Sequence, residues 1–213
     1  LPISDSADDE PKDERHPVYY VSDVEQQGQY IKMFKDNGQD AVILTHNIDT
    51  SFISQLERRN EKYKFVRIDA DITDVVTEEA SEEELKSANE TLSKLFKDSL
   101  GKENLDVKVE KFKNPETASM ITLSEDGIRM EQMMKMYSMS GMPMGDLGAP
   151  ETLVLNINNE LVKYLMDNAD GEHSKLFCEQ LYDLARIANK PLSPDDMTKF
   201  ITRSNTIMLT LAK

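Results

Sequence analysis

Short apolar runs and helical spacings alternate along the first third of the chain. Three runs have the length and composition of buried strands: 18–21, 41–44 and 63–68. Helical spacing between them predicts two helices, with the apolar positions Tyr30, Ile31, Phe34, Ile53 and Leu56. This β-α-β-α-β order predicts a small three-layer α/β subdomain with a parallel sheet over residues 17–77. Residues 1–16 are charged and lack aromatic side chains, which predicts a linker or disordered tail.

The pattern changes after residue 77 to that of an α+β domain, which we expect to cover residues 78–213. A connector at 71–81 leads into a charged amphipathic helix at 82–100. Alternating apolar and polar residues predict a strand at 104–112. After a turn at Asn114-Pro115, residues 118–123 are expected to form its antiparallel partner, and 152–157 a third strand.

Two amphipathic helices close the sequence. The first, at about 172–188, follows a short helix capped by Asn158 or Asn159, and its apolar stripe consists of Phe177, Leu181, Leu184 and Ala188. Ser193 as cap and Pro194 at the first position start the second helix. Its broad apolar stripe consists of Met197, Phe200, Ile201, Ser204, Ile207, Met208 and Leu211. Such a pair fits either packing within one chain or an antiparallel four-helix dimer interface, which we slightly favour.

Methionine is concentrated between Met120 and Met144, which hold eight of the twelve methionines in the chain. On a helix, one stripe would contain Met130, Met133, Met134 and Tyr137, with Met136 beside it. Methionine is flexible and polarizable, so a dense cluster suits a surface that adapts to many partners. An irregular core filled by flexible side chains, or a partly disordered loop, explains the same pattern equally well.

Composition excludes several classes of function. A formal net charge of −15 and the absence of a basic stripe argue against nucleic acid and acidic membranes as partners. The single cysteine, Cys178, lies in an apolar helical setting and predicts a buried, inert thiol in a reducing compartment. No segment resembles a signal peptide or a membrane span, which predicts a cytoplasmic protein. The initial leucine suggests a fragment of a longer chain.

The sequence carries no recognisable motif for catalysis. The connection after the first predicted strand, SDVEQQGQ, lacks a G-x-G-x-x-G turn, and no P-loop is present. The histidines His16, His46 and His173 lie far apart, and His46 fits a turn. The carboxylates at Asp69-x-Asp71 and at 82–84 are interpreted as a solvated connector and a helix start. The sequence therefore predicts no catalytic, cofactor or metal site.

Several segments together resemble one known family. Residues 18–57 resemble the end of the middle region of the heat-shock protein 90 chaperones in their bacterial form, with Tyr19-Tyr20, the strand at 41–44 and Ile48-Asp49 at the family's positions. Residues 105–112, 114–118 and 153–157 resemble a later strand, a turn and a further strand of the same family. The resemblance covers about residues 17–213. It departs from the family where Asn158 is followed by Asn159-Glu160 instead of a proline motif.

The resemblance implies a carboxy-terminal piece of an ATP-driven chaperone that assists protein folding. It implies a homodimer through the last two helices, with an interface formed by Phe177, Leu181, Leu184, Phe200, Ile201, Ile207, Met208 and Leu211. It also implies an exposed helix that binds unfolded or partly folded client proteins through Met130, Met133, Met134, Met136 and Tyr137. The family's site for ATP and magnesium lies in an amino-terminal domain, so this piece is expected to be no enzyme. Two alternatives stay open: an unrecognised small α/β enzyme and a purely structural dimerisation module.

Overall fold

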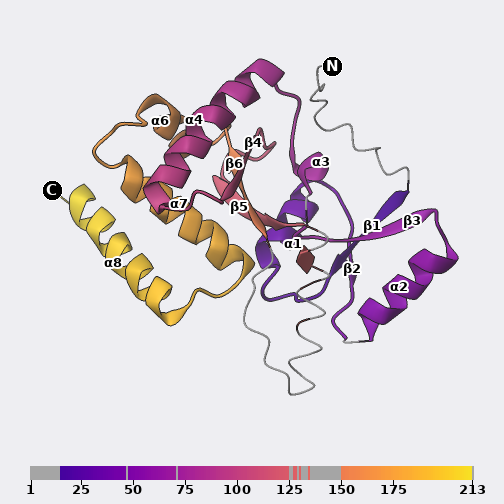
Figure 1. The fold of residues 1–213 in the computed structure, drawn as a ribbon. Coiled ribbons are helices and arrows are strands. Elements are labelled where there is room, and N and C mark those ends of the chain that lie inside the picture. The colour runs from indigo at the N-terminus through magenta and orange to yellow at the C-terminus, as the bar shows by residue number, and fades with distance from the viewer. Residues whose placement is uncertain are drawn as a thin grey trace, which may run out of the picture.

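Two three-stranded sheets with helices around them make up the described part of the molecule (Figure 1). The computed structural model describes residues 15–46, 48–70, 72–124, 127–128, 130, 134 and 150–212. The chain is a mixed α/β protein, in agreement with the α/β and α+β patterns of the sequence. Most of the methionine segment falls outside the described residues.

The first sheet is parallel, as the β-α-β-α-β pattern predicted. Its strand order is β2 (Val42–Ile43), β1 (His16–Val21) and β3 (Tyr63–Arg67), linked by helices α1 (Gly28–Asp36) and α2 (Asp49–Arg59). The expectation of a buried strand at 41–44 is wrong. Strand β2 has two residues at the sheet edge, and Ile43 is 65% exposed, because an edge strand lacks the neighbours that cover a central one.

The second sheet has β6 (Glu151–Asn156) at its centre, between β4 (Asp106–Glu110) and β5 (Ser119–Leu123). Strand β6 pairs parallel with β4 and antiparallel with β5. The predicted antiparallel pairing of the β4 and β5 segments is therefore wrong. The chain leaves β4, passes over the end of the later strand β6 and enters the sheet on its other side.

Three asparagines hold this crossing turn in place. Asn156 is fully buried, and its side-chain oxygen accepts hydrogen bonds from the Phe112 amide (3.0 Å) and the Asn158 amide (2.9 Å). Its side-chain nitrogen donates to the carbonyl oxygens of Asn114 (3.0 Å) and Thr117 (2.7 Å). The side chains of Asn158 and Asn159 add bonds to the carbonyls of Phe112 and Pro115. Backbone groups of the turn thereby have hydrogen-bond partners although the turn joins no hairpin.

Three helices cover the second sheet. Helix α4 (Glu82–Leu100) packs on β4, α7 (Ser174–Asn189) packs on β5, and α6 (Glu160–Asp167) adjoins α4. The bounds of α4 agree with the predicted helix, and Asn159 caps α6 by accepting from the Leu161 amide. The connector before α4 contains a short helix, α3 (Thr73–Val76), which the sequence did not indicate. Strands and helices together enclose one apolar cluster that contains Leu92, Phe96, Ile121, Leu153, Leu155 and Leu165.

A second apolar cluster joins the two sheets. It combines Tyr30, Phe34 and Ile68 of the first half with Phe112, Met120 and Val154 of the second. Burial raises the pKa of the Tyr30 phenol, so its hydroxyl stays protonated and donates to the Ile121 carbonyl. The side chain of Asn189, at the end of α7, donates to the same hydroxyl at 3.3 Å. The predicted division into 17–77 and 78–213 stays a prediction, but the two stretches share this core.

Replacement of Asn156 by alanine is expected to destabilise the protein by roughly 3 kcal/mol, since it leaves buried donors and acceptors of the turn without partners. Urea unfolding followed by circular dichroism measures the change. The control is Asn60→Ala, which removes an exposed side chain that accepts one bond from the Lys62 amide and should cost less than about 0.5 kcal/mol. Equal unfolding midpoints for the two variants would contradict the role of Asn156.

Candidate dimerisation surface

The last helix, α8 (Pro194–Leu211), starts where the sequence predicted. The Ser193 hydroxyl accepts a hydrogen bond from the Asp196 amide at 3.1 Å, and Pro194 is the first helical residue. The Arg186 guanidinium, and after it the Ser193 hydroxyl, lower the pKa of the Asp196 carboxyl. Helix α8 therefore starts with a side-chain cap and an anionic first turn, both of which stabilise a helix N-terminus.

Helix α8 lies along the outer side of α7, away from both sheets (Figure 1). The contacts Gln180–Ser204 and Arg186–Asp196 show that the two helices run antiparallel. None of the 18 residues of α8, all of which the structure describes, is buried. A helix with this many apolar residues normally buries one face, so α8 leaves apolar surface uncovered.

The apolar residues of α8 divide between two sides. Met197, Phe200 and Ile207 are half-buried on the side that faces α7. Ile201 and Met208 are 52% and 59% exposed. The predicted single stripe was thus too broad, because helical spacing groups residues that a neighbouring helix later separates.

Three exposed apolar residues of the two helices lie on the same side of the pair, while the exposed Leu209 points away from α7. Asp183 and Arg203 face each other, and Leu184 follows Asp183 by about 100° around α7. Ile201 and Met208 are offset by a similar angle from the α7-facing residue Phe200. Because the two helices run antiparallel, the offset of Leu184 on α7 and that of Ile201 and Met208 on α8 place the three side chains on the same side of the helix pair. We call Leu184, Ile201 and Met208, all exposed, the α7–α8 apolar surface. Leu211 is also exposed, but it lies at the end of α8 and nearly in line with Phe200.

The other predicted interface residues have different surroundings. Leu181 is buried in the first apolar cluster of its own chain. Phe177 packs partly against that cluster, and its ring meets Tyr164 edge-on at 5.7 Å between centroids. Phe200 and Ile207 face α7. The structure thus leaves four of the eight predicted residues uncovered, and the assignment of an interface to all eight stays a prediction.

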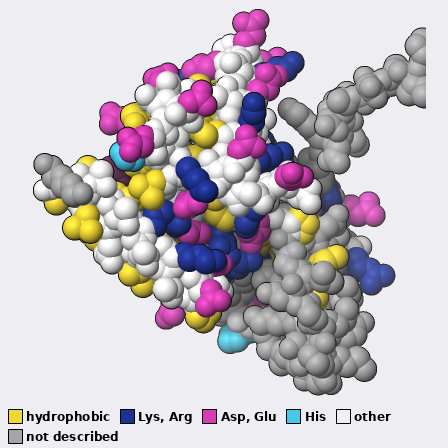
Figure 2. All heavy atoms as spheres, turned by 60° about the vertical axis from the view of Figure 1, so that its left-hand side comes forward, with side chains coloured by type: hydrophobic (Ala, Val, Ile, Leu, Met, Phe, Trp, Pro, Cys, Tyr) yellow, Lys and Arg dark blue, Asp and Glu magenta, His cyan; other side chains and the backbone are white. Residues whose placement is uncertain are grey.

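Charged residues gather next to this surface. Figure 2 shows Lys, Arg, Asp and Glu side chains together in the middle of the face beside α8, with hydrophobic side chains along the outer side of that helix. Arg203 contacts Glu179 and Asp183 of α7, and Arg186 contacts Asp183 and Asp196. We call Glu179, Arg203, Asp183, Arg186 and Asp196 the α7–α8 charged row. Sequence reasoning missed it, although oppositely charged residues at helical spacing on adjacent helices are a usable signal.

The predicted client-binding residues lie mostly beyond the described residues. Met133, Met136 and Tyr137 are outside them, whereas Met130 is 45% exposed and Met134 is half-buried. Met120, the first methionine of the dense segment, belongs to β5 and is buried in the second apolar cluster. The segment therefore begins in the core and reaches the surface by residue 130.

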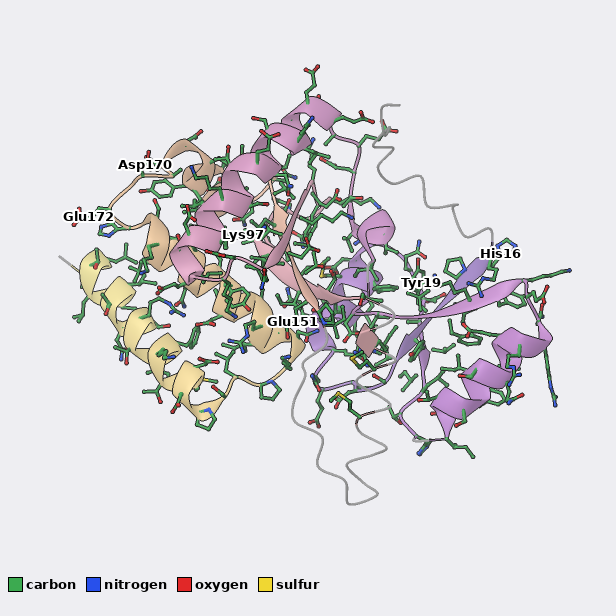
Figure 3. The ribbon with its side chains drawn as sticks, viewed as in Figure 1. His16, Tyr19, Lys97, Glu151, Asp170 and Glu172 are labelled. Atoms are coloured by element: carbon green, nitrogen blue, oxygen red, sulfur yellow. The ribbon has the colours of Figure 1, made fainter. Side chains whose placement is uncertain are left out.

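A shallow hollow lies next to the end of α4 and is lined by Lys102, Glu151 and Tyr182. Lys102 donates to the Tyr182 hydroxyl at 2.8 Å and lies over its ring. Glu151, labelled in Figure 3 at the start of β6, pairs with Lys190 just after α7. These cations already have acidic or phenolic partners, so the hollow offers little excess charge to a ligand. Within the described ranges, no group of three or more His, Cys, Asp or Glu side chains could hold a metal ion.

The Asp69 carboxylate, two residues after β3, differs from its prediction. Asp69 is not part of a solvated connector: it is buried and accepts two hydrogen bonds from Arg67, at 2.6 and 3.0 Å. Its backbone carbonyl accepts from the Leu123 amide, so it joins the two sheets. His46 lies in the turn before α2, where its amide donates to the Asp49 carboxylate at 2.8 Å, as a turn role predicts.

Cys178 is buried, as its apolar setting predicted. Desolvation raises the pKa of its thiol to about 11. Because the thiolate is the reactive form, this setting is unsuitable for a nucleophile at neutral pH. In the residues that the structure describes, no helix is long and apolar enough to cross a membrane.

Fold and surface together define a class: a mixed α/β protein with an uncovered apolar helix pair of the kind used for protein–protein contact. Residues 9–212 match the family described as "Hsp90 protein", and the chain therefore belongs to the Hsp90 family. This finding confirms the resemblance.

Three curated relatives illustrate the similarity, each named chaperone protein HtpG. The protein of Bacteroides fragilis strain YCH46 is 32% identical over 170 residues, which cover 76% of this chain and 25% of the relative. That of Bacteroides thetaiotaomicron is 27% identical over 159 residues, covering 71% and 23%. That of Porphyromonas gingivalis strain W83 is 32% identical over 154 residues, covering 68% and 22%. The chain thus spans about a quarter of the length of these relatives.

Cys178 should react with Ellman's reagent at least roughly 100-fold more slowly in the native protein at pH 8 than in the urea-unfolded protein. The reason is that a thiol with a pKa of about 11 is almost entirely protonated at this pH. Raising the pH from 8 to 10 should accelerate the native reaction, since the thiolate fraction grows about tenfold per pH unit. Stopped-flow absorbance measures both rates, and equal rates in the two states would contradict burial.

Proposed function

We propose that this chain is the dimerisation and client-binding region of an ATP-dependent molecular chaperone that assists protein folding. The observation that carries the proposal is the exposed apolar side of α8. Helix α8 directs charged and half-buried side chains towards α7 and keeps Ile201, Met208 and Leu211 uncovered. A second copy offers the same apolar surface, and two antiparallel helix pairs can bury these residues in a four-helix bundle.

The charge of α8 supports self-association. The whole chain has a formal net charge of −15, which would make two copies repel each other. Within α8, however, Asp195 and Asp196 are balanced by Lys199 and Arg203. Two copies that meet through this helix therefore bring together nearly neutral surfaces.

We assign client binding to the methionine-rich segment and in particular to Met130, Met133, Met134, Met136 and Tyr137. The exposure of Met130 and the names of the HtpG relatives support this assignment. Flexible methionine side chains adapt to different apolar sequences, so weak binding of partly unfolded polypeptides fits their chemistry. We further propose that the site for ATP and magnesium lies outside this stretch, which by itself is no enzyme, and that the protein works in the cytoplasm.

The double variant Ile201→Asp/Met208→Asp tests self-association. We expect light scattering to give about twice 24.3 kDa for the unchanged chain at micromolar concentration and 24.3 kDa for the variant. Carboxylates in the buried centre of an interface should weaken association by roughly 100-fold or more. Both residues are exposed in the single chain, so its fold should tolerate the change.

The matched control is Thr206→Asp, which adds a charge to the other side of α8 and should leave the mass unchanged. A monomeric unchanged chain at every concentration would refute the dimer. A double variant that remains dimeric would refute the assignment of the interface to this side of α8.

The triple variant Met133→Ser/Met136→Ser/Tyr137→Ser tests client binding. We expect its affinity for a fluorescently labelled unfolded polypeptide to fall by about five- to tenfold, because apolar and aromatic anchors dominate such contacts. Fluorescence anisotropy measures the affinity, and the light-scattering mass should stay that of the unchanged chain.

A second triple variant, Val42→Ser/Ile43→Ser/Phe52→Ser, replaces three exposed apolar side chains in another part of the chain. Its client affinity should stay within about twofold of the unchanged chain. If both triple variants lose affinity equally, the binding is a general property of exposed apolar surface and the assignment to the methionine segment is wrong.

A further inference from the structure

One guanidinium group of α8, that of Arg203, makes several polar contacts with α7. Each of the three nitrogens of Arg203 contacts a different side chain of α7. Its Nε donates to the Gln180 amide oxygen at 2.9 Å, Nη1 to the Glu179 carboxylate at 3.3 Å, and Nη2 to Asp183. A planar guanidinium bonded on three sides fixes direction as well as distance.

Arg203 is also the best-shielded charge on α8. Its side chain is 10% exposed and that of Asp183 is 12% exposed, although α8 has no buried residue. Ion pairs at this depth are screened by salt much less than fully exposed pairs. Arg186 continues the charged row by contacting Asp183 at 3.5 Å and Asp196 at 3.2 Å. Charged contacts thus run from the first turn of α8 to its middle.

Apolar contacts alone would hold α8 less specifically. No residue of α8 belongs to either apolar cluster, and the half-buried Phe200 and Ile207 allow a helix to rotate about its axis. A rotation by one residue, about 100°, would turn Ile201 towards α7 and move Met208 away from Leu184. Such a rotation would also carry the guanidinium of Arg203 away from its three acceptors on α7.

We propose that Arg203 is a positioning residue for self-association: its contacts with Glu179, Gln180 and Asp183 set the rotation of α8 that aligns Leu184, Ile201 and Met208 into one surface for a second copy of this chain. The inference rests on the proposed function, since it names what orients the same interface. Arg203 does not itself have to touch the second copy.

The test compares Arg203→Met with Lys199→Met in the full 213-residue chain. Both changes remove one positive charge from α8, but the Lys199 side chain is 73% exposed and pairs at 3.6 Å with Asp196 of the same helix, not with α7. Sedimentation velocity over a dilution series gives the dimer dissociation constant. We expect an increase of at least roughly tenfold for Arg203→Met and less than twofold for Lys199→Met.

Two further variants keep the test valid if Arg203→Met loosens the fold. Arg203→Lys keeps the charge but cannot reach three acceptors, so it should also weaken the dimer. Asp183→Asn removes one partner and should weaken the dimer on its own, yet add less than about twofold to Arg203→Met in the double variant. Additive effects of the two substitutions would overturn the proposed coupling.

The orientation of α8 in the dimer is measured by electron spin resonance distances between nitroxide labels. The labels are attached to Thr206→Cys, on the side of α8 away from the apolar surface. Cys178 is buried and should not be labelled. In the unchanged background the distance distribution between the two labels should be narrow. With Arg203→Met, at concentrations where dimers persist, it should broaden, which a mere loss of stability would not cause.

The outcomes separate the two proposals. A dimer whose dissociation constant and label distances are unaffected by Arg203→Met overturns the positioning role and leaves the proposed function intact. A chain that stays monomeric at every concentration overturns both.

Discussion

The burial of β6 at the centre of the second sheet is the constraint on which the rest of the structure depends. A central strand needs partners on both edges and cover on both faces. Strands β4 and β5 supply the edges, α4 and α7 pack against them, and Val154 of β6 reaches the cluster shared with the first sheet. The strand ends at Asn156, whose four hydrogen bonds satisfy the turn that carries the chain from one edge to the other. The strand order of this sheet therefore depends on a buried polar side chain, Asn156, as well as on the apolar residues of β6.

Helix α7 connects this core to the outer surface. One side of α7 places Cys178, Leu181 and Ala185 in the first cluster, while the opposite side presents Glu179, Gln180 and Asp183 to α8. Its last residue, Asn189, bonds to Tyr30 and through its carbonyl to Gln26. The helix is thus fixed by apolar contacts along its length and by polar contacts at its end. In a surface formed by α7 and α8, only α7 is anchored in the core, because α8 has no buried residue.

The sequence predicts those parts of this arrangement that depend on local signals. Periodicity and the Ser193-Pro194 start signal predicted α4 and α8, and the alternation of strands and helices predicted the parallel first sheet. The pairing of β4 with β6 was not predictable, because it depends on contacts between residues far apart in the chain. For the same reason the apolar stripe of α7 could not show that Leu181 points into the core while Leu184 stays exposed. The row through Arg203 and Asp183 likewise requires knowing which residues of two helices face each other.

Helix α8 faces its own chain with charged side chains and faces solvent with apolar ones, and this has a consequence for its stability. An isolated helix of 18 residues is marginal in water, and tertiary packing of an apolar side normally stabilises it. Here α8 packs on its own chain mainly through charged and half-buried side chains, and its exposed apolar side gains nothing until another surface covers it. If a second copy provides that surface, the stability of α8 depends on protein concentration through mass action. Helix order and self-association are then two aspects of one equilibrium, in which the charged row restricts the orientations of α8 before the apolar surfaces meet.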